Sequence, residues 1–136
     1  MKLITRDTDY AMRAICFIAK SKRRISVQDL VGELKIPRPF LRKILQALNK
    51  EGVLSSHKGQ GGGFDLELVP SKISLLYLVR IFQGPLKFNV CTFRKKICSD
   101  VRLCKVRKKI DKIQEYVSEE LRMVTVASLI KKKRVV

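Results

Sequence analysis

Three cysteines in the C-terminal half of the chain are the residues best suited to chemistry. Cys91, Cys98 and Cys104 are separated by six and five intervening residues. This spacing is too wide for the paired cysteines of zinc ribbons, and no Cys or His follows Cys104 as a fourth ligand. An iron–sulfur cluster tolerates wider spacing, because its irons lie on a larger body than a single ion. The spacing leaves two interpretations open, a shared cluster or ordinary cysteines in a basic segment.

The segment around these cysteines is strongly basic. Residues 85–109 contain nine Lys and Arg residues and one acid, Asp100. Positive charge favours the thiolate form that metals require, and it offsets the charge of an anionic cluster. The basic residues nearest to the cysteines are Arg94, Lys95, Lys96, Arg102, Lys105 and Arg107.

The composition of the whole chain predicts a small, folded and very basic protein. The 136 residues include 30 Lys and Arg against 12 Asp and Glu, which gives a net charge of +18. This length corresponds to about one domain and excludes a large multi-domain enzyme. The charge favours a polyanionic partner, with nucleic acid first and an acidic membrane surface second.

Signals for export and membrane insertion are missing from the sequence. The first residues carry acids and lack the apolar stretch of a signal peptide. No apolar run approaches the ~18 residues that a membrane span needs. We therefore expect a cytoplasmic protein, in which cysteines serve metal or redox chemistry before structural disulfides.

The first fifty residues predict three helices. Apolar residues at helical spacing indicate a helix over about residues 8–19, and Ser26 followed by Asp29 marks the start of a short second helix. Prolines in the segment 36–39 end that helix, and a third helix follows over residues 40–50. One face of this third helix is apolar, and the other is basic and polar. The basic and polar face contains Arg38, Arg42, Lys43, Gln46, Asn49 and Lys50.

A β-hairpin with a glycine-rich tip follows the third helix. Residues 53–58 and 64–68 are the two predicted strands, and four of the chain's seven glycines lie in the five residues between 59 and 63. Helix, short helix, turn, basic helix and hairpin is the order of a winged helix-turn-helix, which places a helix in the major groove of DNA and a wing on the backbone or minor groove. The fold class predicted is mainly α with a small β-hairpin.

The C-terminal half predicts a helix over residues 74–82 and a longer one after the cysteines. Apolar residues three and four apart form a narrow seam on the longer helix, which suits pairing with a second copy. We therefore divide one compact domain into a winged helix-turn-helix (residues 1–84), a cysteine segment (85–105), and a dimerisation helix with the C-terminal segment (106–130). The residues of the seam are Leu103, Val106, Ile110, Ile113 and Val117.

The candidate DNA contacts lie on the third helix and on the wing. Arginine can read guanine through two hydrogen bonds, and lysine is suited to phosphate. A solvated helix face is the alternative for the helix residues. A nucleotide-binding loop is disfavoured for the glycines, because no Lys-Ser or Lys-Thr pair follows them. The candidates are Arg38, Arg42, Lys43 and Gln46 on the helix, and Lys58, Gly59 and Gly61 on the wing.

Together these segments resemble the Rrf-two (Rrf2) type of bacterial transcription regulators, which includes IscR, NsrR and RirA. The segments that resemble it are residues 8–14, 36–41, 45–54, 59–64 and 73–75, together with the three cysteines. The resemblance covers roughly residues 1–130. It implies a homodimeric winged-helix regulator of a partly palindromic operator. It also implies an iron–sulfur cluster bound by Cys91, Cys98 and Cys104, through which iron, oxygen or nitric oxide changes DNA binding.

The resemblance also bears on the fourth cluster ligand. Members similar to IscR have a histidine three residues after the third cysteine, where this chain has Arg107, which cannot serve. Members similar to NsrR use a carboxylate near the start of the first helix, contributed by the partner subunit, and Asp9 matches that position. This favours a 4Fe–4S cluster with Asp9 as a ligand, with a 2Fe–2S cluster as the alternative. Read without the family, Asp9 is an acid that favours the helix N-terminus.

No group of residues in the sequence indicates catalysis. The chain has a single histidine, His57, and no Ser/His/Asp set or paired carboxylates. Cys16 is predicted to be a small buried residue of the first helix. We therefore expect a regulator and not an enzyme. Two alternatives stay open: a cluster-free winged-helix regulator that acts through thiol oxidation or a partner protein, and a non-specific basic nucleic-acid-binding protein.

Overall fold

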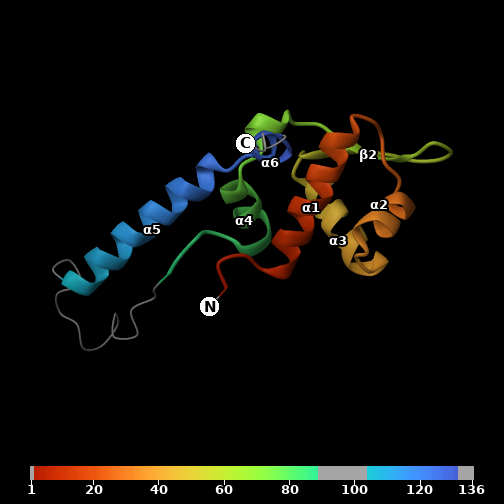
Figure 1. Ribbon diagram of the computed structural model, residues 1–136. Helices are drawn as coiled ribbons and strands as arrows, with labels where there is room; N and C mark the ends of the chain where they lie inside the picture. The colour runs from red at the N-terminus through yellow and green to blue at the C-terminus, as the bar shows by residue number, and fades with distance from the viewer. Residues whose placement is uncertain (1, 89–103, 132–136) are drawn as a thin grey trace.

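The computed structural model of the protein describes residues 2–88 and 104–131. Six α-helices, one short 3-10 helix and a two-stranded antiparallel sheet form this part of the chain (Figure 1). The elements in chain order are α1 (Arg6–Ser21), α2 (Val27–Leu34), α3 (Arg38–Lys50), β1 (Leu54–His57), β2 (Gly63–Leu66), η1 (Pro70–Lys72), α4 (Leu75–Gln83), α5 (Lys105–Met123) and α6 (Val126–Ile130).

Local sequence signals explain where the helices begin and end. The Ser26 hydroxyl accepts a hydrogen bond from the backbone N–H of Asp29 (3.1 Å), which confirms the predicted start of α2. The helix α3 begins at Arg38, two residues before the predicted start, because a proline is accommodated in a first helical turn. The helix α5 ends at Met123, and the hydroxyl of Thr125 caps α6.

Burial of α1 against its neighbours forms the main core. The side chains of Ala11, Ala14 and Ile15 have no exposed surface, and Leu41 and Leu45 of α3 are equally buried. Small alanines let the packed helices approach closely, and each fully buried leucine or isoleucine stabilises the fold by about 1.5–3 kcal/mol. This packing fixes α3 on the body of the protein and leaves its basic face in solvent.

The wing is anchored to the turn between α1 and α2. Strands β1 and β2 pair in register from Leu54 with Leu66 to His57 with Gly63. Ile25 adds a bridge on the outer side of β2, because its N–H donates to the Phe64 carbonyl (3.0 Å) and its carbonyl accepts from the Phe64 N–H (2.8 Å). The turn therefore acts as a short third strand at the edge of the wing.

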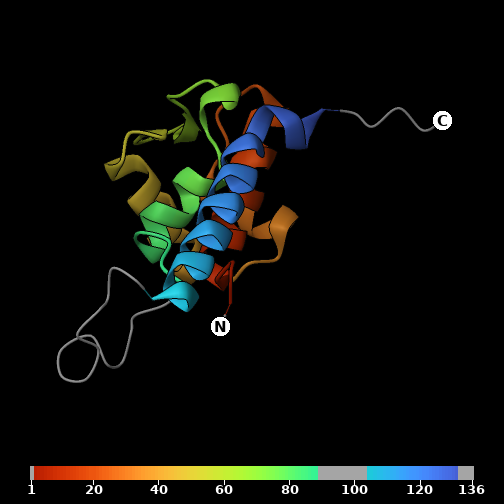
Figure 2. The same cartoon turned by 90° about the vertical axis from the view of Figure 1, so that its left-hand side faces the viewer.

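The C-terminal helices pack on the opposite side of the molecule from the wing. Val117 and Leu121 of α5 pack on Leu76 and Val79 of α4, while the N-terminal part of α5 extends away from the body (Figure 1). In the view turned by 90°, α5 lies in front of the other helices (Figure 2). The chain then returns, and α6 places Val126 in the main core near α1. In the described part of the chain, no helix is long and apolar enough to cross a membrane.

We predict that Gly63→Ala destabilises the protein by about 1–3 kcal/mol. A Cβ atom at Gly63 would collide with the carbonyl oxygen of Ile25, and its φ of 148° is one that L residues rarely adopt. The control is Gly32→Ala in the exposed part of α2, where nothing lies within 4 Å of the added atom. This control should stabilise the protein by up to about 1 kcal/mol, because alanine favours a helix interior over glycine. Urea unfolding measures both, and the same sign of effect in the two variants would contradict the steric explanation.

Candidate nucleic-acid interface

A groove of about 370 Å³ lies between α3 and the wing. Arg42 and Gln46 line it from α3, and Lys58 and Gly59 line it from the wing, so four of the predicted DNA contacts come together here. The apolar side of α3 is held by the core, and the wing is held by the backbone pairs with Ile25. Two elements that are distant in the sequence thus form one basic, concave surface.

The remaining predicted contacts are placed around this groove. Arg38 and Lys43 are exposed on α3, and Gly61 is exposed at the tip of the wing, but these three do not line the groove. Within the described residues, no ion pair involves Arg38, Arg42, Lys43 or Lys58. These side chains are therefore not neutralised by acids of the described part and can meet an external anion.

Two polar residues that line the groove, Asn49 and Ser56, are not among the predicted DNA contacts. Asn49, one turn beyond Gln46, lies on the polar face that the helical period identifies. Ser56 lies on the exposed side of its strand, and strand alternation could have identified it. Both side chains can donate or accept hydrogen bonds, which suits contacts to phosphates and to base edges.

Asp65 of the wing contacts two side chains, His57 and Arg24. His57 Nε2 lies 3.2 Å from Asp65 Oδ1, and Arg24 Nε lies 3.7 Å from Asp65 Oδ2. Arg24 Nη1 also lies 3.5 Å from the carbonyl oxygen of Gly61. Arg24 therefore joins the turn after α1 to the wing, a contact that no local sequence signal indicates.

The predicted cluster ligands fall largely outside the described residues. Cys91 and Cys98 lie outside them, and Cys104 is the half-exposed residue that precedes the first turn of α5. Within the described residues, Cys104 and Cys16 form no disulfide. Residues 2–88 and 104–131 contain no group of three His, Cys, Asp or Glu side chains able to hold a metal ion. The structure thus describes one of the three predicted thiol ligands.

Asp9 lies in the first turn of α1 and forms an ion pair. Its Oδ2 atom lies 3.0 Å from Nε of Arg13, one helical turn later, and both side chains are partly exposed. Figure 1 shows the N-terminal ends of α1 and α5 well apart, so one chain does not bring Asp9 and Cys104 together. Asp9 also has the position of an acid that stabilises a helix N-terminus, as the alternative interpretation predicts.

Gln83 ties the start of α1 to the end of α4. Its Oε1 atom accepts hydrogen bonds from the Thr5 N–H (3.0 Å) and from the buried Thr8 hydroxyl (2.7 Å), and its Nε2 donates to the Leu3 carbonyl (3.0 Å). The chain enters the cysteine segment a few residues after Gln83. The position of the Asp9 turn is therefore set by the same residue that ends α4.

Cys16 packs against the main core as an apolar side chain, but it is only partly buried, whereas the sequence predicted a buried residue. It is half-buried, and burial raises the pKa of its thiol, while nearby Lys20 opposes this by a smaller amount. A raised pKa disfavours the thiolate, which is the form that binds metals and reacts with oxidants.

The N-terminal half of α5 has an exposed apolar face. Val106 is 66% exposed, Ile113 is 41% exposed and Tyr116 is 68% exposed. The same seam becomes buried further along, where Val117 and Leu121 pack on α4. Part of the predicted dimerisation seam is thus used within the chain, and the part nearest to the cysteine segment is left in solvent.

Comparisons of the sequence identify related proteins. A family described as Rrf2, iron-dependent transcriptional regulator, matches residues 4–132. An HTH-type transcriptional regulator of Aquifex aeolicus is 32% identical over 124 residues, which is 89% of this chain and 86% of that protein. An rrf2-like HTH-type regulator of Rhodobacter capsulatus is 31% identical over 116 residues, which is 78% of this chain and 77% of that protein.

Comparisons of the structure confirm the winged-helix fold. CymR, the global cysteine regulator of B. subtilis, has a TM-score of 0.80 at 20% identity, with 96% of this chain and 97% of that chain covered. IscR of T. potens has a TM-score of 0.74 at 20% identity, with 96% and 86% covered. The oxidized form of Staphylococcus aureus CymR has a TM-score of 0.75 at 19% identity, with 99% and 100% covered. At such low identities the similarity shows the fold alone.

Proposed function

The chain belongs to the Rrf2 family of transcriptional regulators, and we propose that it is a homodimer that binds a partly palindromic operator and responds to an iron–sulfur cluster. In this proposal residues 1–84 bind DNA, residues 85–105 hold the cluster, and residues 106–130 comprise the helix that joins the subunits and the C-terminal segment. Its relatives are regulators and not enzymes, in agreement with the sequence prediction. The groove between α3 and the wing is the observation that supports DNA binding most directly.

DNA binding follows from the shape and charge of this groove. An α-helix fits the major groove, where Arg42 can reach guanine edges and Gln46 can reach adenine. Lys58 at the wing is suited to phosphate. Arg38 and Lys43 lie on the exposed side of α3. Gly59 and Gly61 have no side chains and allow the wing backbone to approach DNA closely.

The exposed apolar face of α5 supports a homodimer as its occupant. Val106 and Ile113 belong to the same seam that packs on α4 further along the helix, and the exposed Tyr116 lies beside it. A second copy would cover these side chains by pairing the two α5 helices, as narrow apolar seams do. Two winged helices about one DNA turn apart would then face the two halves of a palindrome.

The chemistry of the donor set fits an iron–sulfur cluster. Three thiolates suit iron in such clusters, and Cys104 precedes the N-terminus of α5, where negative charge is favoured. Asp9 is the proposed fourth ligand, contributed by the partner subunit, which favours a 4Fe–4S cluster over 2Fe–2S. When bound, the cluster supplies a centre whose stability depends on iron supply and oxidants. The chain's own contribution is to hold Asp9 in a turn fixed by Gln83.

A cluster-free regulator is the second candidate function. It draws support from solved structures of similar fold that are described as a global cysteine regulator and as an oxidized form of CymR. In this alternative the cysteines respond as free thiols, and half-exposed Cys104 is accessible for that chemistry. Iron content distinguishes the two candidates.

We predict that the protein purified without oxygen is brown and contains about four irons and four acid-labile sulfides per chain. Cys98→Ser should remove the visible absorption and the iron, because a cluster needs its thiolate ligands. Cys16→Ser is the matched control and should keep both. Asp9→Ala should lower the iron content, whereas Asp7→Ala, in the same first turn of α1, should leave it unchanged.

Each other outcome of this measurement has a defined meaning. About two irons per chain would reject the 4Fe–4S cluster and indicate a two-iron site. Equal iron content in the Asp9 and Asp7 variants would reject Asp9 as a ligand. A colourless wild-type protein that still binds DNA would reject the cluster and favour thiol sensing.

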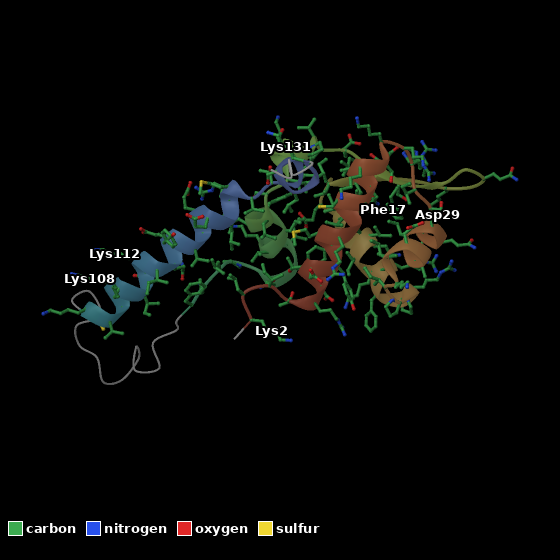
Figure 3. All side chains as sticks on the ribbon, in the orientation of Figure 1. Lys2, Phe17, Asp29, Lys108, Lys112 and Lys131 are labelled. Carbon is green, nitrogen blue, oxygen red and sulfur yellow. The ribbon has the colours of Figure 1, made fainter. Side chains whose placement is uncertain are left out.

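We predict that Arg42→Ala weakens binding to an operator selected from random-sequence DNA by about 1–3 kcal/mol, because the variant cannot make the base contact. Lys58→Ala should weaken binding to the selected operator and to random-sequence DNA equally, because a phosphate contact carries no sequence information. Lys112→Ala on α5, far from the wing in Figure 3, is the control. Fluorescence anisotropy measures all four proteins. A wild type that selects no sequence would favour a non-specific basic nucleic-acid-binding protein.

We predict that Val106→Glu together with Ile113→Glu converts the dimer to a monomer, because two buried charges per subunit would destabilise the apolar interface. The fold of each subunit should survive, since both side chains are exposed in the single chain. Leu129→Glu, an exposed apolar position on α6, is the control and should remain dimeric. Sedimentation velocity measures the mass of each variant. A monomeric wild type, or a dimeric double variant, would reject α5 as the interface.

A further inference from the structure

A basic turn lies beside the wing, on the side away from α3. Lys22, Arg23 and Arg24 are consecutive and exposed, and they connect α1 to α2. Residues 20–24 contain four basic residues and no acid. This turn is part neither of α3 nor of the hairpin, the two elements that the sequence predicts to bind DNA.

Backbone hydrogen bonds fix the turn to the wing. The two hydrogen bonds between Ile25 and Phe64 place the turn next to β2, so that β2 lies between β1 and the turn. Arg24 adds side-chain contacts to Asp65 and to the Gly61 carbonyl. The basic turn therefore forms the outer edge of the wing and keeps a set position relative to it.

A hollow of about 280 Å³ is lined by the end of α1, the basic turn and β2. Lys22, Arg23 and Arg24 line it together with Asp65. Arg24 pairs with the Asp65 carboxylate, and within the described residues no ion pair involves Lys22 or Arg23. These two cations can therefore meet an external anion, and the nearby acid is already paired.

We propose that the basic turn binds the phosphate backbone of the same DNA duplex, on the far side of the minor groove from the contacts of α3. This inference rests on the proposed DNA binding and extends its surface. A wing in the minor groove has a phosphate strand along each edge. Neighbouring strands lie about 4.8 Å apart, so the edge formed by the turn is displaced from β2 by a distance comparable to the ~6 Å width of the minor groove. Lys22 and Arg23 are long enough to reach a phosphate from that edge.

Charge compensation within α1 predicts a different outcome. Lys22 ends α1 in a left-handed conformation with a φ of 52°, and cations near a helix C-terminus offset the helix dipole. Under this explanation the two residues contribute to thermal stability and make no contact with DNA. Salt dependence separates the two explanations, because only a phosphate contact releases counterions.

The test compares four full-length proteins on a fluorescent duplex of random sequence over a range of salt concentrations. Lys22→Gln with Arg23→Gln removes both charges and keeps side chains of similar length. Lys22→Arg with Arg23→Lys preserves the charges. Lys108→Gln with Lys112→Gln removes the same charge from the far end of α5 (Figure 3). Log K falls as log salt rises. We expect this negative slope to become shallower by about 0.9 for each phosphate that the first variant no longer binds, and to stay unchanged in the other two variants.

The outcomes separate this inference from the proposed function. A wild type that does not bind DNA would reject the proposed function itself. Suppose that the wild type binds DNA and that Arg42→Ala weakens this binding. A Lys22→Gln, Arg23→Gln variant with the same salt slope as the α5 control would then reject the phosphate contact of the basic turn and leave the proposed function intact. A lower melting temperature with an unchanged slope would assign Lys22 and Arg23 to charge compensation within α1.

Discussion

Burial of α1 is the constraint on which the rest of the structure depends. Ala11, Ala14 and Ile15 have no exposed surface, and α3, α4, α6 and β2 all pack around this helix. Each neighbour has one apolar face, which is covered by the central helix. Their polar faces are consequently directed outward, and the basic face of α3 is exposed because its leucines are committed to α1.

The two ends of α1 are linked to different parts of the proposed mechanism. At its start, Thr8 is bonded to Gln83, next to the segment that leads to the cysteines. At its end, the turn through Ile25 pairs with Phe64 of the wing. A packed helix is stiff, so a displacement at its first turn would be transmitted to the wing. The central helix is therefore a physical connection between the two sites.

Charge is distributed in the fold so that acids and bases have separate roles. Asp9 and Asp65 are each paired with an arginine of the same chain. The cations that line the α3 groove have no such pair among the described residues. Pairing the acids lowers repulsion toward a polyanion, and it leaves the unpaired cations to define where DNA can bind.

The sequence by itself determined the helices, the hairpin and the basic outer face of α3, because helix and strand periods, caps and glycine turns are local signals. Ser26 starts α2 as expected, and α3 places Arg42 and Gln46 on its outer face. Only the tertiary structure decided which elements meet. The contact between Thr8 and Gln83 joins residues 75 positions apart, and the pairing of Ile25 with Phe64 crosses three elements. Such contacts depend on how buried faces pack together, and the local sequence carries no signal for them.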